Sequence, residues 1–333
     1  MTKRKSPLRR IVGTLALPVV MYLIMMVMCY SNGKMYFGTW NMWKTLIVDI
    51  ALSVTCAMGI GLQFKCGRFD FSGGSIMLLS AIIAGNIARS MGSNIPIMIL
   101  LCMVCCVVLS VLVALFYVYG RIPIVITTIG FALLYEAITC LVFGGTGINI
   151  ISNMTLRKFA TYPAAIWPLI GVIALYAIYS YLTTSGRQAT LLANNQQSAV
   201  NIGIKENKNV IISYVFSGLI FGLATVIWIA KAKHDAAYSS MMTVGQLFSN
   251  ILPVFIGLML ARWCGDTIGI IMGSVTLCLL SYALNAVFAS TLGTAISNIC
   301  MGTFILVINV VNAQGRNMLK SIGKLLKKGV SKA

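Results

Sequence analysis

Negative charge is scarce in this sequence of 333 residues, which has six Asp and Glu residues against 25 Lys and Arg. Only 9% of its residues are charged and 59% are hydrophobic, whereas a soluble domain carries roughly 25% charged residues. Apolar runs of roughly 20 residues, enough to cross a bilayer core, recur from Ile11 to Val311. The composition predicts an all-α polytopic membrane protein and excludes a soluble enzyme. The net charge of +19 does not indicate nucleic acid as a partner, because the basic residues lie at the ends of apolar runs, beside the lipid bilayer.

Groups that carry catalysis are also few. The single histidine, His234, lies in a predicted outer loop beside Asp235 and is interpreted as a surface residue. No G-x-x-x-x-G-K-[ST] motif occurs, so any use of ATP requires another subunit. Most of the ten cysteines fall in apolar runs, where cysteine behaves as a small hydrophobe. We therefore expect no catalytic residue, no metal and no cofactor.

Carboxylates inside the membrane are nearly absent as well. Asp49 lies near the outer end of a predicted span and Glu136 near the centre of another, while the other four acids fall in loops or at span ends. Ion-coupled carriers usually need buried carboxylates, so the sequence has few residues that could couple transport to an ion gradient. Glu136 leaves two interpretations open: it lines a solute path, or it is satisfied by Tyr or Ser neighbours or by a partner helix.

Hydrophobic stretches predict ten membrane helices. With both termini in the cytoplasm, eighteen of the 25 Lys and Arg residues fall inside, as the positive-inside rule requires. The predicted organisation is a basic cytoplasmic N-terminus (1–10), a transmembrane domain (11–311) and a basic cytoplasmic tail (312–333). An inside loop, 183–209, has apolar spacing typical of a short amphipathic helix. The predicted spans are 11–30, 43–64, 75–91, 96–119, 123–143, 163–182, 210–230, 247–262, 266–289 and 293–311.

Two segments in the first half of the chain resemble the ribose-type family of ABC sugar permeases. Residues 67–75 read G-R-F-D-F-S-G-G-S, similar to that family's G-I-D-L-S-V-G-S, and residues 120–123 read G-R-I-P. Aspartate and serine here can accept hydrogen bonds from amides at a helix start, and glycines permit a tight turn. A capping role and a place on the solute path both stay open. The residues concerned are Asp70, Ser72, Gly74 and Ser75, with Glu136 near where many members carry arginine.

A third segment, within the 183–209 loop, carries the most specific resemblance. Residues 184–204 are similar to the family's G-R … A-x-G-G-N-E-x-A-A-R-x-x-G-I signature. In that family this stretch is the coupling helix that docks on the ATPase, and the alternative is a solvated loop helix without a partner. The resemblance therefore implies ATPase coupling through Gly186, Arg187, Asn195, Ser198, Ala199, Gly203 and Ile204.

The resemblance implies the type II ABC importer fold in the bacterial inner membrane. Its expected partners are ABC ATPase subunits, a second permease subunit, identical or related, and an extracytoplasmic solute-binding protein. A pentose or hexose is the expected solute, with hydroxyl and amide groups such as Ser53, Thr55, Asn285 and Asn298 as its partners. The alternatives are a permease for nucleosides or branched-chain amino acids, and a stand-alone secondary carrier or membrane enzyme.

Overall fold

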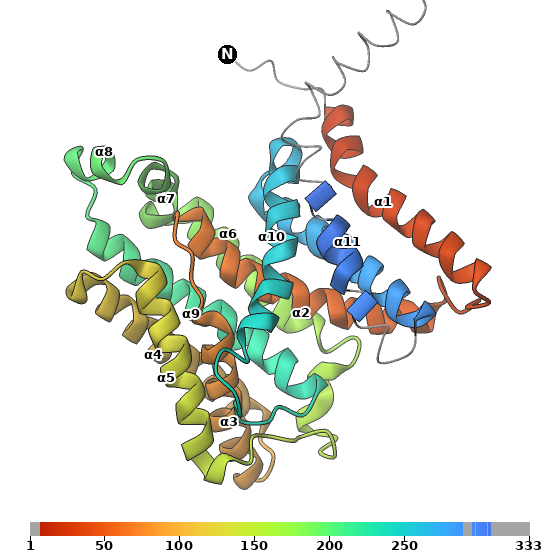
Figure 1. The fold of residues 1–333 in the computed structure, drawn as a ribbon, viewed down its shortest axis with the longest axis horizontal. Coiled ribbons are helices and arrows are strands. Elements are labelled where there is room, and N and C mark those ends of the chain that lie inside the picture. The colour runs from red at the N-terminus through yellow and green to blue at the C-terminus, as the bar shows by residue number, and fades with distance from the viewer. Residues whose placement is uncertain (1–6, 289–294, 297, 305, 308–333) are drawn as a thin grey trace, which may run out of the picture.

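The computed structural model describes residues 7–288, 295–296, 298–304 and 306–307. Within them the chain is a bundle of helices (Figure 1), and extended backbone pairs only in an isolated bridge between Ile148 and His234. Residues 1–6 and 312–333, which make up most of the N-terminal segment and all of the tail, lie outside the described residues. The helices are α1 (Pro7–Ser31), α2 (Trp40–Lys65), α3 (Gly73–Ser90), α4 (Ile95–Gly120), α5 (Ile124–Leu141), η1 (Val142–Gly145), η2 (Leu156–Ala160), α6 (Ile166–Ala177), η3 (Ile178–Leu182), α7 (Thr184–Asn194), α8 (Gln196–Asn201), α9 (Glu206–Lys231), α10 (Val244–Cys264) and α11 (Asp266–Val287).

Membrane-spanning helices account for most of the described chain. Seven helices are long and apolar enough to cross a bilayer, and an eighth span forms if α6 and η3 are counted together with α7, which is bent from them by 72°. The predicted span 75–91 appears as α3, which falls short of that standard with Asn86 and Arg89 in its last turns. The predicted span 293–311 lies partly outside the described residues. The all-α polytopic fold is confirmed, while the count of ten is not.

α2 and α9 form the centre of the bundle. Two-thirds of the apolar window of each, 67%, is buried against other helices, whereas the corresponding windows of α1 and α4 are only 22% and 28% buried. Water does not reach these helices in a bilayer, so exposed apolar faces such as those of α1 and α4 face lipid. The arrangement places polar groups in the middle of α2 and α9, such as Thr55, Ser217 and Thr225, inside the protein.

Small residues allow α9 to approach α4 closely. Cβ atoms added at Gly218 and Gly222 would lie 2.7 and 2.6 Å from the Cα atoms of Val107 and Met103. Glycines four residues apart lie on one face of a helix and let two backbones touch, which is how helices associate where the hydrophobic effect is absent. Larger side chains at these positions would force α4 and α9 apart.

Two long segments without regular structure lead into α3 and α10. Residues 66–72 run from the end of the molecule where α7 lies to the start of α3, and residues 232–243 lead from the end of α9 to the start of α10 (Figure 1). A Cβ atom at Gly74 would lie 2.7 Å from the carbonyl oxygen of Thr243. The N-termini of α3 and α10 therefore meet inside the bundle.

Candidate functional site

The region resembling a coupling helix forms two short helices rather than one, α7 and α8, which lie together at one edge of the molecule (Figure 1). Thr183 begins α7: its side chain accepts a hydrogen bond from the Gly186 amide at 3.0 Å and donates one to the Tyr179 carbonyl at 2.6 Å. A Cβ atom at Gly186 would lie 1.9 Å from that same carbonyl oxygen. Glycine is thus required where the chain bends from η3 into α7.

α8 is fixed by a cap and a small apolar core. The Asn195 side chain accepts a hydrogen bond from the Ser198 amide at 3.0 Å, and Gln196 donates to the Glu206 carboxylate at 2.6 Å. Beneath α8, Leu192 packs with Ala199 and Ile204. These contacts attach α8 to the start of α9, a central helix of the bundle.

The structure brings the seven predicted coupling residues together in one unit but gives them different tasks. Arg187, Asn195, Ser198 and Gly203 are exposed, while Gly186, Ala199 and Ile204 are buried. The buried three shape the unit from within. Three apolar residues behind the amphipathic spacing of the loop were not among the predicted coupling residues, yet the unit presents them outward: Leu191, Val200 and Ile202, at 50%, 44% and 72% exposure.

A second group of predicted residues lies at the start of α3. The Asp70 carboxylate accepts hydrogen bonds from the amide and the hydroxyl of Ser72, at 2.7 and 2.6 Å. Burial raises the pKa of Asp70, and the bonds from Ser72 oppose that rise. Ser75 donates to the Ser72 carbonyl at 2.9 Å. Asp70 thus accepts from one amide just before the helix, whereas the Ser72 and Ser75 hydroxyls donate rather than accept, and no side chain caps the first turn of α3 as the capping interpretation expected.

Of Gly67 and Gly74, only Gly67 has the role that the sequence predicted for the glycines of this segment. Gly67 has a φ of +75° and does form a tight turn, but Gly74 does not. Its Cβ position is blocked by Thr243, so glycine is needed there for close packing between α3 and α10. The prediction that it permits a turn was wrong at Gly74.

Glu136, on α5, holds the segment that leads into α10. Its Oε1 accepts hydrogen bonds from the amide and the hydroxyl of Thr243 at 2.7 and 2.6 Å, and its Oε2 accepts one from the Met241 amide at 2.7 Å. Both oxygens are occupied and the residue is buried. The bonds favour the second interpretation of Glu136, with main-chain amides rather than Tyr or Ser as its partners.

The two buried carboxylates play matching parts. Asp70 bonds Ser72, the N-cap residue of α3, and Glu136 bonds Thr243, the N-cap residue of α10. Each places negative charge near the positive end of a helix dipole, which stabilises both the helix and the charge. Thr243 has no sequence signal that would have revealed it, since its partner Glu136 is 107 residues away.

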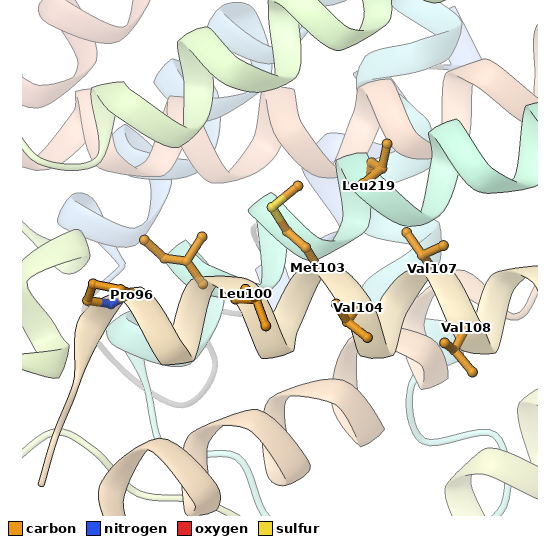
Figure 2. A pocket seen from close by; sticks show the side chains of 8 residues that line it. Pro96, Leu100, Met103, Val104, Val107, Val108 and Leu219 are labelled. Atoms are coloured by element: carbon orange, nitrogen blue, oxygen red, sulfur yellow. The ribbon is translucent and has the colours of Figure 1, made fainter. Parts of the chain in front are cut away.

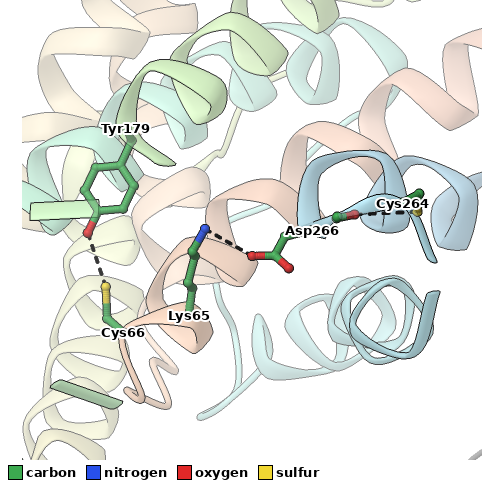
Figure 3. Close-up of polar contacts among 6 residues, drawn as sticks. Lys65, Cys66, Tyr179, Cys264 and Asp266 are labelled. Atoms are coloured by element: carbon green, nitrogen blue, oxygen red, sulfur yellow. Dashed lines mark hydrogen bonds and ion pairs between the residues drawn. The ribbon is translucent and has the colours of Figure 1, made fainter. Parts of the chain in front are cut away.

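All six acidic residues of the chain have partners in the structure. Glu206 bonds Gln196, and the three remaining acids form ion pairs: Asp266 with Lys65 at 3.0 Å, Asp235 with Lys233 at 2.7 Å, and Asp49 with Lys231. Figure 3 shows the first of these, which ties the end of α2 to the start of α11 beside the contact of Cys66 with Tyr179. Each of the six Asp and Glu side chains therefore has at least one polar partner in this structure.

The position of His234 corrects the prediction that it is a surface residue. The side chain is 9% exposed, stacks on Trp228 with ring centroids 3.7 Å apart, and makes a 2.9 Å hydrogen bond with the Trp228 carbonyl. Burial lowers the pKa of the imidazole. Arg68, in the segment between α2 and α3, is 6% exposed and donates to Ser213 on α9 at 2.8 Å.

Outside the helix starts, a functional site could be a cluster of metal ligands or a cavity with polar side chains. Within the described residues no group of three or more His, Cys, Asp or Glu side chains could hold a metal ion. A cavity of about 650 Å³ between α4 and α9 is lined by apolar side chains such as Leu100, Met103 and Leu219 (Figure 2). The residues that line this groove offer no side-chain hydrogen-bonding group to a solute hydroxyl.

Comparison with known proteins identifies the family. A sequence profile described as "Branched-chain amino acid transport system / permease component" matches residues 42–309, which include both groups of predicted residues. The chain belongs to this permease family. The match covers α2 through α11, so the whole described bundle beyond α1 is the permease fold, and the protein is a multi-pass membrane protein.

Curated relatives of the permease are similar over most of its length. It is 23% identical over 278 residues to the "Ribose import permease protein RbsC" of Escherichia coli (strain K12), covering 81% of this chain and 85% of the relative. It is 21% identical to the "Fructose import permease protein FruG" of Bifidobacterium longum, covering 80% and 81%. The "Autoinducer 2 import system permease protein LsrC" of Photorhabdus luminescens is 26% identical over 56% of this chain and 58% of its own. The resemblance to import permeases drawn from the three sequence segments is confirmed.

Proposed function

We propose that this chain is the membrane-spanning permease subunit of an ATP-driven ABC importer for a sugar, in a bacterial inner membrane with both termini in the cytoplasm. The observation that carries the proposal is the coincidence of two independent features. Relatives similar over four-fifths of the chain are import permeases for ribose and fructose. The chain itself has no G-x-x-x-x-G-K-[ST] nucleotide-binding motif, and its few Asp and Glu side chains are each already bonded to another group of the chain.

The ATPase docks, in this proposal, on α7 and α8. Leu191, Val200 and Ile202 are apolar side chains exposed on a unit that is otherwise polar, and such patches mark protein contacts. The Gln196–Glu206 bond and the packing of Ala199 and Ile204 connect this surface to α9. A movement of the ATPase therefore displaces α9 as a rigid body, which is how packed elements transmit a switch.

The remaining parts of the importer follow from the same proposal. A second permease subunit, identical or related, completes the solute path, and an extracytoplasmic binding protein delivers the solute. In this arrangement Asp70, Ser72, Gly74, Ser75 and Glu136 keep the ends of α3 and α10 together next to the path. They position the helices and do no chemistry.

Ile202→Glu tests the docking surface. We expect it to reduce solute-stimulated ATP hydrolysis at least tenfold, because a charge replaces an apolar contact while the exposed position leaves the fold intact. Met154→Glu is the matched control, since Met154 is 92% exposed at the opposite end, beyond α5. Equal hydrolysis by the Ile202→Glu, Met154→Glu and unaltered transporters would show that α8 does not contact the ATPase.

A branched-chain amino acid is the second candidate solute, because the matching profile is described by that substrate. Uptake by the assembled transporter in proteoliposomes, measured with radiolabelled D-ribose, D-fructose and L-leucine, separates the two. Uptake of leucine without either sugar would overturn the proposed substrate class but not the role as a permease.

A further inference from the structure

A polar cavity of about 440 Å³ lies between α2, α9 and α11. It is at the end of the bundle opposite to α7 and α8, because α9 begins next to α8 and reaches the cavity with its last residue, Lys231. The volume is within the range of small-molecule sites, which is roughly 300–1,000 Å³. The polar groups of its wall are those of Tyr36, Asp49, Lys231, Ser281, Tyr282 and Asn285.

The wall contains charge that is paired within it. Asp49 and Lys231 form an ion pair, and their side chains remain 32% and 31% exposed. The side chains of Tyr282 and Tyr36 line the same space as Asp49, and Asn285 lies over Ser281, with 3.5 Å between the amide nitrogen and the hydroxyl oxygen. Carboxylate, ammonium, phenol, hydroxyl and amide groups thus face one space, unlike the apolar cavity beside α4 (Figure 2).

We propose that this cavity binds a neutral polyhydroxylated solute, such as a monosaccharide, at the outer end of the permease. The inference rests on the proposed function and names the site at which that function takes up its solute. Adjacent hydroxyl groups of a sugar can donate to the Asp49 carboxylate and accept from the Lys231 ammonium without separating the pair. The rings of Tyr36 and Tyr282 provide faces for the apolar side of a sugar ring.

The wall suits an amino acid less well. A zwitterion would place its ammonium on Asp49 and its carboxylate on Lys231, and these charges would compete with the existing ion pair, whereas neutral hydroxyl groups do not. An aliphatic side chain also needs an apolar pocket, and the apolar area of this cavity comes mainly from Cys278, Ala286 and the tyrosine rings. The geometry therefore favours the polyol.

Direct binding to the full-length chain in lipid nanodiscs tests the proposal, with saturation-transfer NMR and calorimetry as the readouts. The probes are D-ribose, D-fructose, D-xylose, D-glucose and myo-inositol, with L-leucine as competitor. Ser281→Phe fills the cavity and is expected to abolish binding. Ser249→Phe is the matched control, since Ser249 is exposed on α10 away from the cavity.

Asn285→Leu provides a graded second variant, since it removes one amide from the wall. We expect it to weaken binding by roughly three- to tenfold, the effect of one lost hydrogen bond. Asn41→Leu, at an exposed asparagine in the first turn of α2, is its control. Unfolding temperatures of all four variants are measured to check that the fold is retained.

The proposal is supported if at least one sugar binds, Ser281→Phe abolishes binding, Ser249→Phe retains it and leucine does not compete. It is overturned if none of the five probes binds, if binding survives Ser281→Phe, or if leucine displaces the sugar. Failure of this inference is distinct from failure of the proposed function. If the assembled transporter takes up sugar with ATP but no sugar binds in the cavity, only the proposed site is refuted. If sugar binds but no uptake occurs, the proposed function is refuted.

Discussion

Replacing Glu136 with glutamine removes the charge that holds the segment leading into α10. Glutamine keeps one acceptor oxygen for Thr243, but its amino group then faces the Met241 N–H, so two donors meet where a 2.7 Å bond was made. A hydrogen bond to a charged group contributes about 1.5–3 kcal/mol, and a neutral one about 1 kcal/mol. One charged bond is lost and two are weakened, partly offset because a neutral side chain costs less to bury. We expect a net loss of about 3 kcal/mol.

The assay is thermal unfolding of the purified full-length chain in detergent, combined with hydrogen exchange at residues 232–243. Glu206→Gln is the control, because Glu206 is only partly buried and accepts a single bond from Gln196. We expect Glu136→Gln to unfold on the order of 5 °C lower and its Met241 amide to exchange faster, with little change in Glu206→Gln. Identical melting and exchange in both variants and the unaltered chain would refute the assignment of Glu136 as an anchor.

Two further predictions concern packing and pH. Gly222→Leu should destabilise the chain by about 3 kcal/mol through overpacking, because its Cβ meets the Met103 backbone, whereas Gly130→Leu, at a helical glycine with open space around it, should cost little in the same melting assay. Equal melting of the two would contradict the α4–α9 contact. Because burial lowers the pKa of His234 below its ordinary value of 6.5, the unfolded chain takes up a proton that the folded chain refuses, so stability falls as the pH drops below that value. His234→Gln should lose less stability than the unaltered chain between pH 7.5 and 5.5, and an equal loss would argue that His234 is not responsible.

The membrane helices could be predicted from hydropathy because each is a local property of roughly 20 successive residues. The loop that became α7 and α8 was located by charge and by its resemblance to a known family, and Gly186 was among the residues named there. The sequence could not reveal why glycine is needed at position 186, where a Cβ atom would lie 1.9 Å from the Tyr179 carbonyl oxygen.

Contacts between residues far apart in the chain could not be predicted from the sequence. The Glu136–Thr243 bonds, the Gly74–Thr243 contact and the Arg68–Ser213 bond join residues far apart in the chain. His234 was placed on the surface because a lone histidine in a loop carries no sign of the Trp228 ring that covers it. Such pairs are set by the packing of whole helices, which no local pattern encodes.

The central claim is that this permease moves solute only when an ATPase acts on α7 and α8. The most direct measurement compares solute flux into proteoliposomes that contain this chain alone with flux into proteoliposomes that contain it with its ATPase, its partner permease subunit and its binding protein, with ATP present in both. We predict no flux from the chain alone and ATP-dependent accumulation in the complete assembly. Rapid accumulation by the chain alone, driven by an ion gradient, would contradict the claim.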